Sequence, residues 1–163
     1  MEHLSGQNLD LGSLPGREVF DELIERVGLR ISSNCISVTR PTEVNSYLAA
    51  TLSDFLRHQL VNAGTDFCSE TVLSHPSKVD FLRDTQNLGY RNYFYYVATA
   101  GPQINIGRVR NRVLEGGHNV PEDKINDRYY RSIELAKQCL PYTYRAFFFD
   151  NSFISARLIA QVT

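Results

Sequence analysis

Apolar residues recur every three or four positions in five segments of the chain, which predicts five helices. The strongest stripe follows Thr42, the expected N-cap residue, and consists of Leu48, Leu52, Phe55, Leu56 and Leu60. Two prolines stand where a helix can begin, and each is followed by another apolar stripe. The predicted helices are 19–27, 42–63, 77–87, a helix from Pro102 to Gly116-Gly117, and a helix from Pro121 to Pro141.

Short runs rich in aromatic and β-branched residues separate these helices, and such runs are typical of strands. Residues 90–99 (YRNYFYYVAT) and 146–150 (AFFFD) carry few charges and predict strands buried on both faces. Residues 65–71 predict another strand, and 29–38 predict a small hairpin. Residues 156–162 (ARLIAQV) fit either a last strand or a short helix.

After residue 64, predicted strands alternate with predicted helices. This alternation indicates βαβ units and predicts an α/β fold with a largely parallel sheet. Ligands of such sheets bind outside the carboxyl ends of the strands. The polar strand ends are Glu70-Thr71, Ala98-Thr99 and Asp150-Asn151-Ser152.

The chain has 163 residues, a length that predicts one domain over 1–163, with 1–15 as a loose terminus. Its net charge of −1 argues against a generally basic nucleic-acid binder. No apolar run is long enough to span a membrane. The three cysteines form no C-x-x-C pair, which argues against a zinc ribbon and predicts buried thiols in a reducing cytosol.

The densest set of cations lies on two neighbouring predicted helices. Arg108 and Arg112 are four residues apart and share one face of the first helix. Gly116-Gly117-His118 is the turn to the second helix. A clamp for phosphate is one interpretation, because guanidinium groups bind phosphate oxygens in pairs. A solvated face neutralised by nearby carboxylates is the other. The cations of the second helix are Lys124, Arg128 and Arg131.

Two polar strand ends offer further chemistry. Glu70 of Ser69-Glu70-Thr71 could orient a magnesium-bound water or accept a proton from a hydroxyl substrate. A helix cap or loop hydrogen bond is the alternative. Asp150-Asn151-Ser152 suits a nucleotide base or ribose, or simple turn chemistry. His75 and His118 lack any spacing that indicates a metal site.

Four segments, in this order, resemble the zeta-toxin-like family of P-loop kinases, over roughly residues 45–152. They are FCSETVLSHPSKVDFL, GYRNYFYYVAT, RVRNRVLEGGHNVPEDKINDRYYRS from Arg108 to Ser132, and RAFFFDNS. The resemblance implies a three-layer P-loop NTPase-like parallel sheet, ATP and magnesium as cofactors, and a helical lid over 101–140. It also implies phosphoryl transfer to a small molecule, as zeta toxins phosphorylate a UDP-amino-sugar.

The resemblance also assigns candidate residues. Glu70 and Thr71 match the family's E-T pair beside substrate and magnesium, and Arg112 and Arg128 match lid arginines that reach the ATP phosphates. These four are the candidate catalytic residues. The candidate nucleotide-binding residues are Arg108, Arg112, His118, Arg128, Asp150 and Asn151, with the last two near the base pocket.

One family feature does not occur in this sequence. No G-x-x-x-x-G-K-[ST] loop and no Gly-Lys pair is present, nor is the short element with the catalytic Asp that follows that loop. Judged by the usual length of such a unit, the chain begins about 35 to 40 residues late. We therefore expect weak or absent ATP turnover, because this loop supplies much of the positioning and charge stabilisation. The expected central strand is also missing.

Without that strand, the predicted strands at 66–70 and 91–98 have exposed edges. They could pair with each other, accept the 29–38 hairpin, or be covered by a second chain in a homodimer. Three hypotheses for function follow. The chain is a non-catalytic module that keeps a phosphate- or nucleotide-binding lid, or part of a kinase whose natural start lies upstream. The third is a binding protein, either a partner of an intact homologue or a nucleic-acid binder, and the near-neutral charge disfavours nucleic acid.

Overall fold

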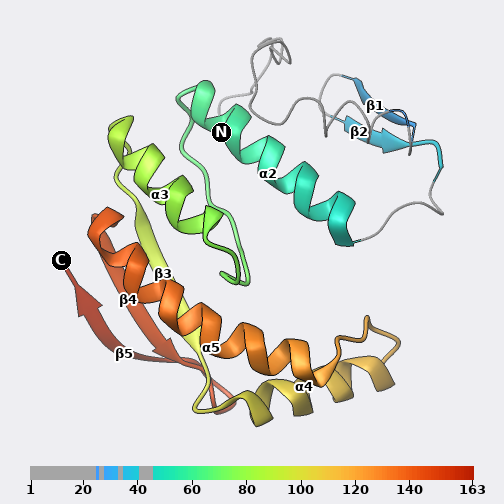
Figure 1. Cartoon of the computed structure of the whole chain (residues 1–163), viewed down its shortest axis with the longest axis vertical. Coiled ribbons are helices and arrows are strands. Elements are labelled where there is room, and N and C mark those ends of the chain that lie inside the picture. The colour runs from blue at the N-terminus through green and yellow to red at the C-terminus, as the bar shows by residue number, and fades with distance from the viewer. Residues whose placement is uncertain (1–24, 26–27, 33–34, 41–45) are drawn as a thin grey trace. The chain divides into compact units, whose positions relative to one another are not determined.

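The structure is a computed structural model of the whole chain (Figure 1). It describes residues 25, 28–32, 35–40 and 46–163. They belong to two compact units, Met1–Ser69 and Glu70–Thr163. The predicted loose terminus, the N-cap Thr42 and nearly all of the predicted helix 19–27 lie outside the described residues.

The first unit contains a hairpin and one long helix. Strands β1 (Leu29–Ser32) and β2 (Cys35–Val38) pair antiparallel, which confirms the predicted hairpin. Helix α2 (Ser46–Asn62) confirms the helix predicted over 42–63 within the described residues. Leu48 and Phe55 of its apolar stripe are buried, whereas Leu56 of the same stripe is exposed.

The second unit is a three-stranded sheet with helices, whose strand order is β3-β4-β5. β3 and β4 are parallel, whereas β4 and β5 are antiparallel. The class is therefore α/β, but the sheet is mixed rather than largely parallel. Its elements are α3 (Ser77–Asn87), β3 (Tyr93–Ala98), α4 (Pro102–Leu114), α5 (Glu122–Cys139), the 3-10 turn η2 (Leu140–Tyr142), β4 (Arg145–Asp150) and β5 (Arg157–Val162).

Prolines and glycines set the helix boundaries as predicted. Pro102 opens α4, and Pro121 directly precedes α5. Gly116 follows α4 with a φ of +85°, a left-handed conformation that favours glycine. Two helices joined by this turn thus make the long crossover that two parallel strands require.

The strand predicted over 65–71 is wrong, because residues 65–74 form no helix or strand. A strand is stable only when its backbone groups pair with a neighbour. No backbone pairing between this segment and β3 is present among the described residues. The segment enters the core only at Leu73, which is buried and has a φ of +52°.

The core of this unit lies between the sheet and two helices, α3 and α5. Its fully buried centre is Cys139 at the end of α5. Phe94 and Tyr96 of β3 pack against this cluster from one face of the sheet. The other buried members are Leu73, Val79, Leu135 and Ala136.

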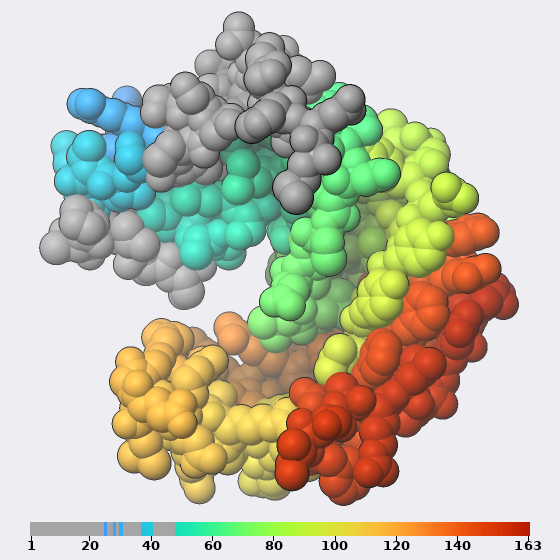
Figure 2. All heavy atoms as spheres, turned by 180° about the vertical axis from the view of Figure 1, so that it is seen from behind, coloured from blue at the N-terminus to red at the C-terminus, as the bar shows by residue number. Residues whose placement is uncertain are grey.

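The prediction that β3 and β4 are buried on both faces is also wrong. Exposed and half-buried residues alternate along β3, most residues of β4 are only half-buried, and β5 is exposed throughout. Figure 2, which views the molecule from behind, shows the strands of this unit at the surface. The described helices of the unit therefore cover one face of the sheet, and an aromatic face remains bare.

Candidate functional site

The carboxyl ends of β3 and β4 meet, as the α/β pattern predicts. The Asn151 N–H donates to the Ala98 oxygen at 2.7 Å and extends the parallel pairing by one residue. The Ala100 N–H donates to the Ser152 hydroxyl oxygen, also at 2.7 Å. The loop after β4 is thus joined to the start of the crossover after β3.

Asp150 holds this loop in shape. Its Oδ1 accepts hydrogen bonds from the Ser152 hydroxyl and, at 2.9 Å, from the Ser152 N–H. Hydrogen bonds from the Ser152 side chain and backbone lower the pKa of the Asp150 carboxyl, and the charge of Arg157 lowers it further. Asp150 is therefore an ionised turn-forming group at neutral pH, which agrees with the turn-chemistry interpretation.

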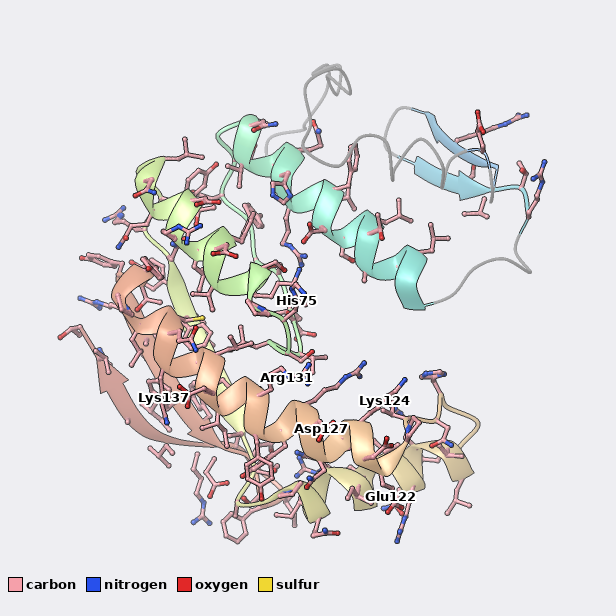
Figure 3. All side chains as sticks on the ribbon, viewed as in Figure 1. His75, Glu122, Lys124, Asp127, Arg131 and Lys137 are labelled. Atoms are coloured by element: carbon pink, nitrogen blue, oxygen red, sulfur yellow. The ribbon has the colours of Figure 1, made fainter. Side chains whose placement is uncertain are left out.

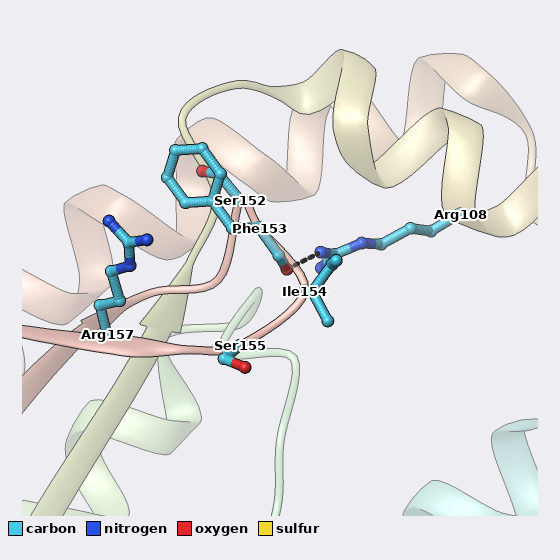
Figure 4. A pocket seen from close by; sticks show the side chains of 6 residues that line it. All are labelled: Arg108, Ser152, Phe153, Ile154, Ser155 and Arg157. Carbon is cyan, nitrogen blue, oxygen red and sulfur yellow. Dashed lines mark hydrogen bonds between the residues drawn. The ribbon is translucent and has the colours of Figure 1, made fainter.

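An open pocket of about 600 Å³ lies beside this loop (Figure 4). Two cations reach it from different elements, Arg108 from α4 and Arg157 from the start of β5. The remaining lining is hydroxyl, aromatic and aliphatic. The lining residues are Arg108, Ser152, Phe153, Ile154, Ser155 and Arg157.

Both arginine side chains are exposed, and the described residues occupy only some of their N–H donors. Arg108 Nη2 donates to the main-chain oxygen of Asn151 at 2.6 Å and of Phe153 at 3.5 Å. The Arg157 guanidinium lies 4.9 Å from the centre of the Phe153 ring. A guanidinium has five N–H donors, so each can also bind an anion. The pocket therefore combines two permanent cations with an aromatic ring and hydroxyl groups.

The other predicted lid cations have different neighbours. Arg112 donates to the His118 oxygen at 2.7 Å, and its own oxygen accepts from the Gly117 N–H at 2.8 Å. Arg112 therefore closes the turn between α4 and α5. Arg128 is exposed on α5 and makes no hydrogen bond or ion pair within the part of the chain that the structure describes. No interaction joins Arg112 to Arg128 among those residues.

Two further arginines, one on α4 and one on α5, connect structural elements. Arg110, which the sequence analysis did not single out, forms an ion pair with Glu122 at 2.6 Å and ties α4 to α5. Arg131 of α5 donates to the Ser74 oxygen at 3.4 Å, beside the loop that carries His75 (Figure 3). Within the described residues, the carboxylate pairing of the second interpretation is thus found at Arg110 and not at the five cations that the sequence singled out.

Glu70 and Thr71 lie in the exposed segment before α3. The Thr71 hydroxyl oxygen accepts a hydrogen bond from the Leu73 N–H at 3.2 Å, which is the loop hydrogen bond named as the alternative. Glu70 has no hydrogen bond or ion pair with the described residues.

No complete metal site is present among the described residues. Nowhere in the described ranges do three His, Cys, Asp or Glu side chains gather closely enough to hold a metal ion by themselves.

None of the helices in the described part is long and apolar enough to cross a membrane.

Of the candidate nucleotide-binding residues, Arg108 lines this pocket, and Asn151 lies beside it as a main-chain acceptor for Arg108. Arg157 and Phe153 were not among the candidates from the sequence. The sequence indicates these two residues only weakly. Arg157 is a cation near the start of a predicted strand, and Phe153 is an aromatic residue in the loop before that strand.

Comparison with known proteins adds one relative. An "Uncharacterized protein" of Haemophilus influenzae is 28% identical over 74 residues, which are 45% of this chain and 53% of the relative. The chain thus spans about half the length of that curated relative. No family model and no solved structure matches the chain. The fold and pocket therefore define the class only as a mixed α/β protein with a cationic pocket at its strand ends.

Proposed function

We propose that the Glu70–Thr163 unit binds the phosphate of a nucleotide or other phosphorylated small molecule in the pocket between Arg108 and Arg157. The observation that carries the proposal is that these two exposed arginines, from different elements, both line one pocket beyond the ends of β3 and β4. This edge of an α/β sheet is where ligands ordinarily bind.

The chemistry of the lining supports a phosphorylated ligand over a neutral one. Two permanent cations favour an anionic ligand, and each planar guanidinium can bind phosphate oxygens in pairs. The Ser155 hydroxyl can add a hydrogen bond, and the Phe153 ring offers a surface on which a base can stack. The negative charge of Asp150 would repel a phosphate. Hydrogen bonds from Ser152 and the positive charge of Arg157 stabilise that charge and reduce the repulsion.

The proposal includes the finer fold assignment, a P-loop NTPase-like sheet of the zeta-toxin-like type. Its support is the resemblance in sequence, together with two parallel strands joined by a helical pair in the position of the family's lid. The printed sequence contains no G-x-x-x-x-G-K-[ST] loop, so this chain alone binds the ligand without transferring phosphate. Arg112 and Arg128 remain candidates for additional phosphate contacts.

The test is calorimetric titration of the full chain with ATP and with inorganic pyrophosphate. We expect Arg157→Gln and Arg108→Ala each to weaken binding roughly 10- to 100-fold, the range for losing charge-assisted hydrogen bonds. Arg145→Ala is the matched control, because it removes one exposed cation at the opposite end of β4. Arg128→Ala tests the lid more cleanly than a change at Arg112, which also closes the turn.

Two outcomes contradict the binding proposal: no binding of either probe at millimolar concentration, and equal losses in Arg157→Gln and Arg145→Ala. Release of phosphate from ATP with magnesium above the buffer rate would instead refute the expected inactivity of this chain. Arg157→Gln carries more weight than Arg108→Ala, because Arg108 also holds the loop at Asn151.

A second candidate function, a binding protein without catalysis, is favoured by the bare face of the sheet. Tyr95 of β3 stacks on Phe147 of β4 with ring centres 4.9 Å apart, yet Tyr95 is 60% exposed. Exposed aromatic surface of this kind marks interaction sites. The test is binding of single-stranded DNA at two salt concentrations, because phosphate contacts make affinity strongly salt-dependent.

A further inference from the structure

The outer edge of β3 carries backbone groups that no described residue pairs with. The oxygens of Asn92 and Ala98 both point toward β4, since they accept hydrogen bonds from Tyr144 (2.8 Å) and Asn151 (2.7 Å). Backbone groups of successive strand residues point to opposite sides. The N–H and C=O groups of the odd-numbered residues therefore point away from β4. These residues are Tyr93, Tyr95 and Val97.

This edge lacks the features that proteins use to prevent pairing with another strand. β3 contains no charged residue and no proline, and its register with β4 has no bulge. β5 at the other edge of the sheet has both Arg157 and a register shift opposite Phe148/Phe149. The unprotected edge is therefore the one at β3.

The side chains beside this edge are also uncovered. Tyr93, Tyr95 and Val97 are 49%, 60% and 53% exposed, and they lie on the bare face of the sheet. An apolar strand with free hydrogen-bonding groups and an exposed aromatic row is a ready template for a second strand.

We propose that a second copy of this chain pairs with β3, antiparallel and about a twofold axis that passes beside Tyr95. Tyr95 is the middle one of the three edge residues, so only this register uses all of their free N–H and C=O groups. Tyr93 of each copy then lies opposite Val97 of the other. Six hydrogen bonds join the copies, and the two sheets become one sheet of six strands.

Charge and area both fit a second copy. In this register Arg91 falls opposite Thr99, so no two like charges face each other. The exposed parts of Tyr93, Tyr95 and Val97 offer on the order of 300 Å² of side-chain surface per copy, taking large side chains at about 150–250 Å². A standard interface buries about 800 Å² per partner, so the dimer is weak and depends on concentration.

Hydrogen exchange of the full chain at several concentrations gives the first test. The amides of Tyr93, Tyr95 and Val97 should gain protection as concentration rises from about 5 to 500 µM. The amides of Phe94, Tyr96 and Ala98 should be protected throughout, because they face β4. Sedimentation over the same range should show conversion from monomer to dimer. A monomer at every concentration overturns the proposal, as does edge protection that does not change with concentration.

A charge exchange at the twofold axis gives the second test. Tyr95→Lys and Tyr95→Glu each place like charges directly opposite, so each variant alone should be monomeric at 500 µM. An equal mixture of the two should form dimers again, which also shows that both variants fold. Leu158→Lys is the matched control on β5, because Leu158 is 54% exposed against 60% for Tyr95.

The remaining outcomes overturn the proposal. A mixture that stays monomeric while both variants keep the circular dichroism of the unmodified chain excludes pairing at Tyr95. Loss of dimer in Leu158→Lys, but not in Tyr95→Lys, assigns the interface to the sheet face rather than the edge. Salt-sensitive binding of single-stranded DNA by a monomer assigns the aromatic row to nucleic acid.

Discussion

The hydroxyl of Tyr129 on α5 donates a hydrogen bond of 2.8 Å to the main-chain oxygen of Thr99, the residue that follows β3. Thr99 is itself buried, and its hydroxyl donates to the Gly101 oxygen at 3.1 Å. The helical pair is thereby held to the strand end beside which the candidate pocket lies. The position of α5 depends on this contact as well as on packing.

Removing that hydroxyl should loosen the helical pair. We expect Tyr129→Phe to lower the free energy of unfolding by about 1 kcal/mol, because the Thr99 oxygen loses its donor. Tyr130→Phe is the control, since Tyr130 is exposed and adjacent. Urea denaturation of the full chain measures both. Equal effects of the two substitutions would show that the Tyr129 hydroxyl has no special role.

Asn92 should be one of the most sensitive polar positions. Its amide nitrogen donates to the oxygens of Leu82 (2.8 Å) and Tyr142 (2.9 Å), and its amide oxygen accepts from the Thr85 hydroxyl (3.0 Å). One side chain thus joins α3, β3 and η2. Asn92→Leu should cost about 1–3 kcal/mol, because it leaves partly buried polar groups unpaired. The exposed Asn126→Ala should change stability by less than about 0.5 kcal/mol in the same urea titration.

Two glycines of the helical pair should respond with opposite signs. A Cβ at Gly117 would lie 2.5 Å from Arg112 Cγ and 2.8 Å from the Arg112 oxygen, so Gly117→Ala should disrupt the turn and lower the melting temperature. At Gly107, inside α4, nothing lies within 4 Å of such a Cβ. Gly107→Ala should therefore stabilise the chain by roughly 0.5–1 kcal/mol. Thermal melts of both variants measure the two changes in melting temperature. Changes of the same sign would contradict the close approach of Gly117 to Arg112.

The two cysteines whose side chains are described should differ sharply in reactivity. Burial raises the pKa of the Cys139 thiol to about 11, so its reactive thiolate is almost absent at pH 8. Cys68 is exposed. Iodoacetamide at pH 8 should label Cys68 first and should label Cys139 only after urea unfolds the chain. Mass spectrometry of the two peptides measures this, and rapid labelling of Cys139 in the folded chain would refute its burial.

Much of the local structure could be predicted from the sequence because it depends on neighbours along the chain. Pro102 and Pro121 mark the beginnings of α4 and α5, since a proline lacks the N–H that a first turn leaves unpaired. The spacing of Leu48 and Phe55 marked the buried side of α2. Residues 156–162 were left open between strand and helix, and pairing of β5 with β4 makes them a strand.

The candidate site was predictable only in part. Arg108 and Asn151 were both selected by sequence, but their hydrogen bond joins residues 43 positions apart and comes from the fold. The separation of four residues placed Arg108 and Arg112 on one helix face, but it did not show which groups each side chain would contact. Arg108 reaches the loop after β4, whereas Arg112 reaches the turn before α5.

What the sequence determined by itself was most of the helices and strands in the described residues and their α/β order, because propensities, caps and periodicity act over a few residues. Only the tertiary structure decided that 65–71 is not a strand, that one sheet face is bare, and that Arg157 and Phe153 join Arg108 at one pocket. Those outcomes depend on which distant segments come together, and the free energy of burial and pairing is set by those contacts rather than by local sequence.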